Sequence, residues 1–346
     1  MTSLASRVPK PVRRRLGRIK RTLTGASTAG SNSGTSAASS AASRLRRRRD
    51  FVFRTADPAG TILEVGPAHN PILPRRDGFR TRNVDYLDRD GLVEKYRDFK
   101  QYSPDDIEDV DYVITAGRAM ADVIPDRFDV VLASHVLEHS ISLIDFLNDC
   151  ASLLAPGGVL SLVIPDHRYT FDRFRERSSI GRVIDASIAR PSVHTVGTLT
   201  EFSLFRVTHK GRTSWPAGHA GTYRFVHDLG VVRDNAERAR GEAYIDVHNW
   251  VFSPNHLRLL LHDLASLGLV TVREAAFQDT VGHEFFLNLT VDGPGSGLTR
   301  EELVALADAE RRAMDVPVFE PPSVADRSLP HAAGVAPSID PAEHEG

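Results

Sequence analysis

The 346-residue chain has little cysteine and no long apolar run, and each shortage excludes a class of protein. Its one cysteine, Cys150, excludes an internal disulfide framework and a cysteine-rich zinc module. No stretch approaches the ~18 consecutive apolar residues that a transmembrane helix requires. The content of 41% hydrophobic and 25% charged residues is ordinary for a globular protein. We therefore expect a cytoplasmic protein with a buried core.

Acidic residues are missing from the first 49 positions, which hold thirteen arginines and lysines. Residues 22–43 are almost entirely Ser, Ala, Gly and Thr, a composition too small and polar to bury a core. We predict that residues 1–50 form a basic, disordered leader. Two alternatives stay open, namely peripheral attachment to an anionic membrane and an organelle transit peptide. The rest of the chain is acidic, so nucleic acid is not an expected partner.

Short apolar runs alternate with amphipathic stretches from residue 60 onward. The predicted strands are Thr61–Val65, Asn83–Tyr86, Asp111–Thr115, Phe128–Ala133, Gly158–Ile164, Val270–Ala276 and Glu284–Val291. The predicted helices are Ser142–Leu154, a helix from Pro254 to about Leu267 with Ser253 as its N-cap, and Thr299–Met314. This alternation predicts an α/β fold with a mostly parallel sheet and helices on both faces. Residues 166–250 are too long for a plain connection, so we expect a lid insert after the fifth strand.

The first predicted strand runs into a tight turn at Gly66, where a residue without a Cβ lets a ligand approach the carboxyl end of the strand. The sequence after Gly66 lacks the G-x-G-x-x-G fingerprint, which disfavours a dinucleotide pyrophosphate site. Asp85 ends the second strand, where a carboxylate can accept hydrogen bonds from ribose hydroxyls. These features predict a site for an adenosine-type ligand.

The segment Phe128–His139 is the most specific motif in the chain. Its end, His135-x-x-Glu138-His139, fits the H-x-x-E-H spacing of one class of zinc peptidase. That chemistry needs both histidines inside one helix, whereas here a strand leads directly into the motif. We therefore expect His135 at a strand-to-helix turn and disfavour a zinc peptidase.

Four segments occur together in a recognisable order: Leu63–Gly66, Asp85, Phe128–His139 and Leu153–Pro165. In order and spacing they resemble the class I S-adenosylmethionine-dependent methyltransferases over residues 60–170. The resemblance implies a Rossmann-like seven-stranded sheet, a methyltransferase domain over 51–295, and a terminal segment 296–346 that forms a helix and a disordered tail. The first loop and the segment Pro165–Asp172 are similar to enzymes associated with bacterial surface glycans.

The resemblance also implies how the cofactor S-adenosylmethionine is held. Glu64 would organise the methionine end, and Gly66 would give backbone access. Asp85 would bind the ribose with Tyr86 beside the adenine. The remaining implied contacts are Ala116 and Gly117 at the adenine, and Ser134 and His135 at the methionine moiety. Relatives often place an acid at the end of strand three, whereas this chain has Thr115.

A sugar hydroxyl is a poor nucleophile at neutral pH and needs a base or a metal to activate it. We favour His139 and His248 as catalytic residues and predict no metal. Other candidates stay open: Asp166, His167, Asp172, His194, His209, His219 and Asp246, with Asp166 and Asp172 as a pair that could hold Mg²⁺. We predict O-methylation of a sugar hydroxyl in a cell-envelope glycan or a glycosylated metabolite. The alternatives are methylation of another small molecule or of a macromolecule, and an inactive cofactor-binding scaffold recruited by the basic leader.

Overall fold

The computed structural model describes residues 33–98, 102–115, 118–217, 221–241 and 244–319. The chain divides into two compact units, 1–43 and 44–346, and the elements that build the site belong to the second. Its main sheet has seven strands in the order β3-β2-β1-β4-β5-β9-β8. Their bounds are β3 (Tyr112–Val113), β2 (Arg80–Asp85), β1 (Thr61–Val65), β4 (Phe128–Ser134), β5 (Leu154–Pro165), β9 (Glu284–Thr290) and β8 (Arg273–Val281). The first five are parallel and β9 is antiparallel to both neighbours, so the predicted Rossmann-like, mostly parallel sheet is confirmed.

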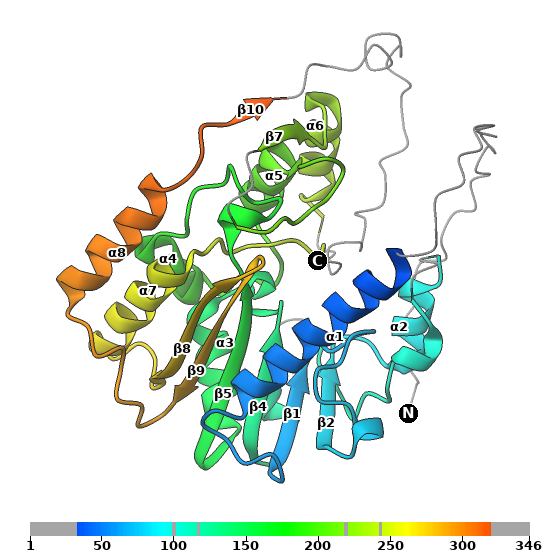
Figure 1. Cartoon of the computed structure of the whole chain (residues 1–346), viewed down its shortest axis with the longest axis vertical. Helices are drawn as coiled ribbons and strands as arrows, with labels where there is room; N and C mark the ends of the chain where they lie inside the picture. Colours follow the sequence, from blue (N-terminus) through cyan, green and yellow to red (C-terminus); the bar gives the residue numbers. More distant parts are fainter. Residues whose placement is uncertain (1–32, 99–101, 116–117, 218–220, 242–243, 320–346) are drawn as a thin grey trace, which may run out of the picture. The chain divides into compact units, whose positions relative to one another are not determined.

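Both faces of the sheet are covered because its central strands are apolar on both sides. On one face, the helices α3 (Leu143–Ser152) and α7 (Pro254–Ser266) pack against β4 and β5 in a single buried cluster. On the other face, Phe51 and Val52 join strand residues of β1, β4 and β9 together with Ile72 and Leu73 from the loop after β1. The sheet and the covering helices are visible in Figure 1.

The helix α1 (Ser33–Val52) corrects the prediction of a disordered leader for residues 33–50 of the predicted range 1–50. Phe51 and Val52 are fully buried, and the side chain of Arg48 is almost completely buried. Alanine and arginine are strong helix formers, so a segment too polar to build its own core still forms a helix when its last turn can pack on the sheet. Residues 1–32 lie outside the described part of the chain.

The helices α7 and α8 (Arg300–Arg312) are joined by a polar contact that the sequence did not predict. Ser253 is the N-cap of α7, as expected, but its hydroxyl makes no cap hydrogen bond. It donates to the Glu310 carboxylate of α8 at 2.6 Å, and Glu310 also accepts from the backbone N–H of Asn255 at 2.8 Å. A carboxylate from α8 therefore satisfies the first turn of α7 and fixes the two helices together.

The chain between β5 and α7 contains several short elements. They are α4 (Ile180–Ala189), α5 (Val196–Phe205), β6 (Val207–Thr208), β7 (Thr222–Phe225) and α6 (Leu229–Arg238). β6 and β7 form a small sheet with β10 (Val318–Phe319), and Phe171, Leu199 and Phe202 belong to a separate small core. Figure 1 shows α5, α6 and β7 beyond the carboxyl end of β5. None of the described helices is both long enough and apolar enough to cross a membrane.

Candidate active site

The turn after β1 opens the backbone toward the carboxyl ends of the strands. Gly66 has a φ of 62°, in the left-handed region that favours glycine, and its N–H donates to the Val84 carbonyl at 2.8 Å. A Cβ at this position would lie 3.1 Å from the Val136 side chain. The site therefore needs glycine here both for the turn and for the close approach.

Glu64 holds the loop that follows Gly66. Its carboxylate is buried and accepts hydrogen bonds from the backbone N–H groups of Ile72 at 2.6 Å and Leu73 at 3.1 Å. Burial raises the pKa of Glu64 to about 7, although the two backbone donors act in the opposite direction. The structure thus gives Glu64 a role in fixing the loop, and its contact with the methionine end of the cofactor stays a prediction.

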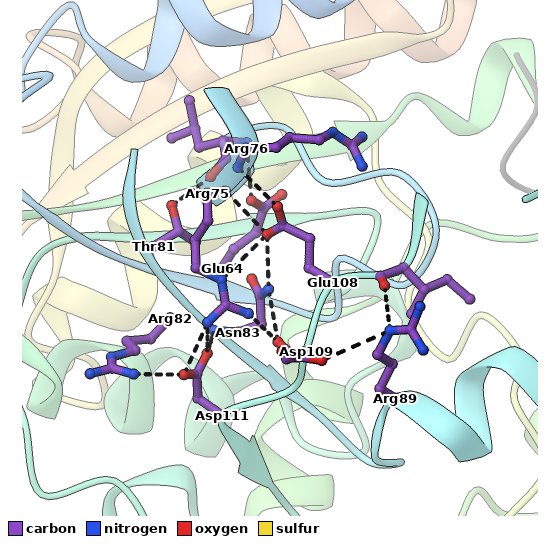
Figure 2. A network of polar contacts seen from close by, with 12 residues as sticks. Glu64, Arg75, Arg76, Thr81, Arg82, Asn83, Arg89, Glu108, Asp109 and Asp111 are labelled. Carbon is purple, nitrogen blue, oxygen red and sulfur yellow. Dashed lines mark hydrogen bonds and ion pairs between the residues drawn. The ribbon is translucent and has the colours of Figure 1, made fainter. Parts of the chain in front are cut away.

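A second set of acids also holds this loop (Figure 2). The Glu108 carboxylate accepts from the backbone N–H groups of Arg75 at 3.2 Å and Arg76 at 3.3 Å. Asp111 accepts from the guanidinium of Arg82 and from the backbone N–H of Asn83, both at 2.8 Å. The loop after β1 is therefore tied to β2 by the segment before β3. The run of acids at 108–111 was the available signal, and the sequence analysis did not use it.

A pocket lies at the carboxyl ends of β1 and β4, where parallel α/β sheets bind ligands. Its lining residues are Arg48, Glu64, Val65, Gly66, Pro67, Ala68, His69, Asn70, Ser134 and His135. The structure therefore brings together four of the predicted cofactor residues, namely Glu64, Gly66, Ser134 and His135. Arg48 was missed because it lies in the segment interpreted as a disordered leader.

His135 stands at the predicted strand end with a φ of 54°, and its Nε2 lies 2.9 Å from Oε1 of Glu284. The Glu284 carboxylate also accepts a hydrogen bond from Nε of Arg48 at 3.2 Å. The guanidinium and the imidazole hold the pKa of this buried carboxyl well below its usual range. Arg48, His135 and Glu284 thus form one charged network at the edge of the pocket.

Asp85 ends β2, as predicted, and Tyr86 directly follows the strand, although the predicted strand included it. The Asp85 carboxylate is 7% exposed and accepts from the Tyr86 N–H at 2.7 Å, and burial raises the pKa of Asp85 to about 6. The Tyr86 ring is partly exposed, with the Lys95 ammonium 5.0 Å from its centroid. A buried carboxylate beside an accessible aromatic ring fits a ribose and an adenine. Ala116 and Gly117, the other predicted adenine residues, lie outside the described part of the chain.

His139 and His248, the two predicted catalytic residues, come together from different parts of the chain. His139 ends the short 3₁₀ turn Leu137–His139 after β4, whereas His248 lies in the insert. Their ring centroids are 4.5 Å apart, and the angle between the ring planes is 82°. The Asp246 carboxylate lies 2.8 Å from Nδ1 of His139, and Asp172 accepts from Nδ1 of His248 at 2.5 Å.

Each of these carboxylates has a cation beside it. Arg175 donates to Asp172 at 2.8 Å, and Lys95 lies 3.3 Å from Asp246. With the neighbouring imidazoles, these cations hold the pKa values of Asp172 and Asp246 below the usual range, against the effect of burial. Both acids are therefore ionised at neutral pH and keep their histidines oriented.

Glu138 is a site residue that the sequence analysis left without a role. Its side chain is 1% exposed, and neither carboxylate oxygen has a hydrogen-bond partner among the described residues. Its backbone carbonyl accepts from the N–H groups of Asn249 at 2.7 Å and Trp250 at 3.0 Å, which joins the insert to the turn after β4. The same turn thus presents His135 to the cofactor pocket and His139 to the second histidine.

The alternative Mg²⁺ pair does not form in this structure. The Asp166 carboxylate is engaged by Arg168 and by the Thr280 hydroxyl at 2.6 Å, and Asp172 is engaged by Arg175 and His248. Among the described residues, neither acid belongs to a group of ligand atoms close enough to share a metal ion. His219 lies outside the described residues.

Comparison with known protein families shows the family to which this chain belongs. A family model described as a methyltransferase domain matches residues 38–264, and the chain belongs to that family. A ubiquinone biosynthesis O-methyltransferase of Parvibaculum lavamentivorans is 43% identical over 51 residues, which are 15% of this chain and 20% of that protein. The chain therefore matches only about a fifth of this relative's length.

Solved structures are similar at low TM-scores. The CcbJ methyltransferase from Streptomyces caelestis is 24% identical over 36% of this chain and 50% of its own, with a TM-score of 0.27. The glycopeptide N-methyltransferase MtfA is 11% identical over 71% and 93%, with a TM-score of 0.36. The DhpI–SAH complex is 15% identical over 76% and 89%, with a TM-score of 0.36.

As a member of this family, the chain uses S-adenosylmethionine as its methyl donor. The described residues fit this cofactor. Gly66 leaves room at the end of β1 that a Cβ would fill, and Asp85 presents a buried carboxylate at the end of β2. The chain therefore contains a methyltransferase domain whose described residues fit S-adenosylmethionine.

Proposed function

We propose that this enzyme methylates a hydroxyl oxygen of a sugar, in a cell-envelope glycan or a glycosylated metabolite. The observation that supports a hydroxyl acceptor is the pair of imidazole–carboxylate contacts, His139 with Asp246 and His248 with Asp172. A hydroxyl must lose its proton to become an effective nucleophile, and an oriented imidazole is the side chain suited to take it. The sugar class rests on the similarity of the first loop and of Pro165–Asp172 to enzymes of bacterial surface glycans.

The relative in Parvibaculum lavamentivorans supports oxygen as the acceptor atom, since its name describes an O-methyltransferase. That support is limited to the short matched stretch. The insert between β5 and α7 supplies His248, so we propose that it acts as a lid that forms the acceptor side of the site.

In this proposal, residues on one side of the turn after β4 hold the cofactor, and residues on the other side take the proton of the acceptor. When bound, S-adenosylmethionine supplies a sulfonium methyl group, whose bond to sulfur breaks toward sulfur as the acceptor oxygen bonds to the methyl carbon. Gly66, Ser134 and His135 would hold its methionine end. Asp172 accepts the Nδ1 proton of His248 and so leaves Nε2 to take the proton of the acceptor hydroxyl.

The test is a methyl-transfer assay by mass spectrometry with sugars, small phenols and amines offered separately. We expect O-methylated sugar, and we expect His248→Gln to lower kcat by about 100-fold or more while cofactor binding is retained. His262→Gln, a partly exposed histidine on α7, is the matched control and keeps the rate. Methylation of amines alone would overturn the hydroxyl assignment. Full activity of His248→Gln would overturn the role of the imidazole.

A further inference from the structure

We propose that Glu138, His139 and His248 form a binding site for one divalent transition-metal cation of the Zn²⁺ or Mn²⁺ kind. The inference revises the expectation that the protein has no metal site. Binding of the cation does not depend on the proposed function. The role we give it, lowering the pKa of the acceptor hydroxyl, rests on that function.

The geometry of the three side chains is close to that of a ligand set. Their candidate ligand atoms all lie within 4.8 Å of one another, and Oε1 of Glu138 is 3.9 Å from Nε2 of His248. Around a tetrahedral zinc ion with bonds of about 2.1 Å, two ligand atoms are ~3.4 Å apart. A closing movement of about 1 Å or less by these side chains is therefore enough to complete the coordination.

The Glu138 carboxylate supplies the independent sign of a missing ligand. It is 1% exposed and has no hydrogen-bond partner among the described residues. The nearest recorded nitrogens, Nδ1 of His135 at 3.6 Å and Nε2 of His248 at 3.9 Å, are beyond hydrogen-bond distance. Burying a carboxylate in this way costs free energy that a coordinated cation would recover.

The carboxylates behind the two histidines complete the pattern of a metal site. Metal-binding histidines characteristically give their other ring nitrogen to a carboxylate, which fixes the ring and increases its basicity. Asp246 lies 2.8 Å from Nδ1 of His139, and Asp172 accepts from Nδ1 of His248. Both histidines are therefore arranged to present Nε2 as a ligand.

The structure contains a second group, His135, His283 and Glu284, that also brings three possible ligands together. There the carboxylate is already engaged by the guanidinium of Arg48 and by His135. A cation at Glu284 would have to compete with a buried arginine, whereas a cation at Glu138 would meet no such competitor. The comparison favours the Glu138 group.

Two imidazoles and one carboxylate favour zinc, manganese, iron or cobalt over Mg²⁺ and Ca²⁺, which prefer oxygen ligands alone. Three protein ligands also leave a coordination position open, as in catalytic metal sites. An acceptor hydroxyl at that position would lose its proton to water more readily. With the cation bound, His139 and His248 act as its ligands, and water takes the acceptor proton in place of Nε2 of His248.

The experiment is an equilibrium titration of the full chain, stripped with a chelator, with ZnCl₂ and with MnCl₂ against a chromophoric competitor. We expect about one zinc ion per chain. We expect Glu138→Gln and His248→Gln to weaken binding by at least about 100-fold, and Asp246→Asn by about 10–100-fold. His262→Gln should bind as the wild type does, and circular dichroism checks that every variant is folded.

Two results would overturn the proposal. The first is a stripped wild-type protein that binds neither cation more tightly than the buffer components do. The second is loss of binding in His283→Gln with retention in Glu138→Gln, which would place the cation at the other group. Neither readout uses an acceptor, so a failure of metal binding is distinguishable from a wrong sugar assignment.

Discussion

Arg48 in α1 and Glu284 at the start of β9 are joined side chain to side chain although 236 positions separate them in the chain. The Arg48 side chain is 7% exposed and the Glu284 side chain 1% exposed, so water is largely excluded from both charges. Glu284 in turn contacts His135 in the cofactor pocket. A residue of the basic N-terminal segment is therefore part of the folded domain and of the edge of its active site.

The first prediction concerns Arg48 and the point at which the chain can be shortened. Removing one partner of a buried ion pair costs about 3–5 kcal/mol, because the other charge stays buried without compensation. We expect Arg48→Met to lower the melting temperature by on the order of 10 °C. Arg46→Met, whose guanidinium is 84% exposed, should stay within about 2 °C of the wild type.

Truncation gives a second measure of the same contact. A chain that starts at Arg44 should keep the stability of the domain, and a chain that starts at Asp50 should lose it, as followed by calorimetry. Equal stability of the two truncated chains would contradict the importance of Arg48. If this expectation holds, a deletion of residues 1–49 also destabilises the fold, and loss of function in that variant would not distinguish an enzyme from a scaffold recruited by the basic leader.

The second prediction is a pH dependence of stability due to Glu64, whose pKa is raised from 4.5 to about 7. The folded protein then binds this proton more tightly than the unfolded chain does. The contribution is fully present below about pH 4.5 and is lost as the pH rises toward 7. Relative to Glu64→Gln, the wild type should become less stable by about 3 kcal/mol between pH 4.5 and 7.5.

Urea denaturation at several pH values measures this difference, with Glu94→Gln on the exposed face of α2 (Arg89–Tyr96) as the control. The control should follow the wild type at every pH. A difference between wild type and Glu64→Gln that does not change with pH would show that Glu64 does not titrate in this range.

The third prediction concerns cofactor affinity and Asp85. A ribose hydroxyl donates best to an ionised carboxylate, and the pKa of Asp85 is raised to about 6 by burial. Calorimetric titration with S-adenosylmethionine should therefore show affinity falling by about tenfold per pH unit below 6. Asp85→Asn should bind weakly with little dependence on pH in this range, whereas Asp90→Asn, exposed on α2, should behave as the wild type does.

The fourth prediction uses two glycines that share a backbone conformation. Gly66 and Gly157 have φ values of 62° and 78°, so alanine is strained at both by roughly 1–2 kcal/mol. A Cβ at Gly157 meets nothing within 4 Å, whereas at Gly66, which lines the cofactor pocket, it lies against the Val136 side chain. Both alanine variants should lose stability, but only Gly66→Ala should lose cofactor affinity. Equal cofactor affinity of the two variants would remove Gly66 from the site.

The sheet was predictable from the sequence because its strands are continuous apolar runs. β1 was predicted with its observed bounds, and β4 differed from its prediction by a single residue at Ser134. The helix α1 was not predicted, since its stability comes from packing on a sheet that the local composition does not reveal. The short elements of the insert were also not predicted. Their small core is built from residues distant in the chain, so no local periodicity reveals it.

The site was predictable where a motif ends a strand and unpredictable where tertiary contacts decide the chemistry. Asp85 follows from its place at a strand end, whereas Ser134 and His135 follow from the family resemblance of the motif that ends β4. Three features depend on how the insert packs against the turn after β4. They are the proximity of His139 to His248, the ionised Asp172 beside His248, and the Glu138 carboxylate, which has no hydrogen-bond partner among the described residues. No pattern of spacing in the sequence predicts this contact between the insert and the turn after β4.

In the proposed site, the turn from His135 to His139 separates the cofactor pocket from the acceptor side. One end lines the cofactor pocket, the other meets the histidine of the insert, and the Glu138 carbonyl bonds the insert to the middle. In the proposed mechanism, the length of this turn therefore sets the distance between the bound cofactor and the acceptor. A single residue added there would leave a protein able to bind each reactant and unable to bring them together.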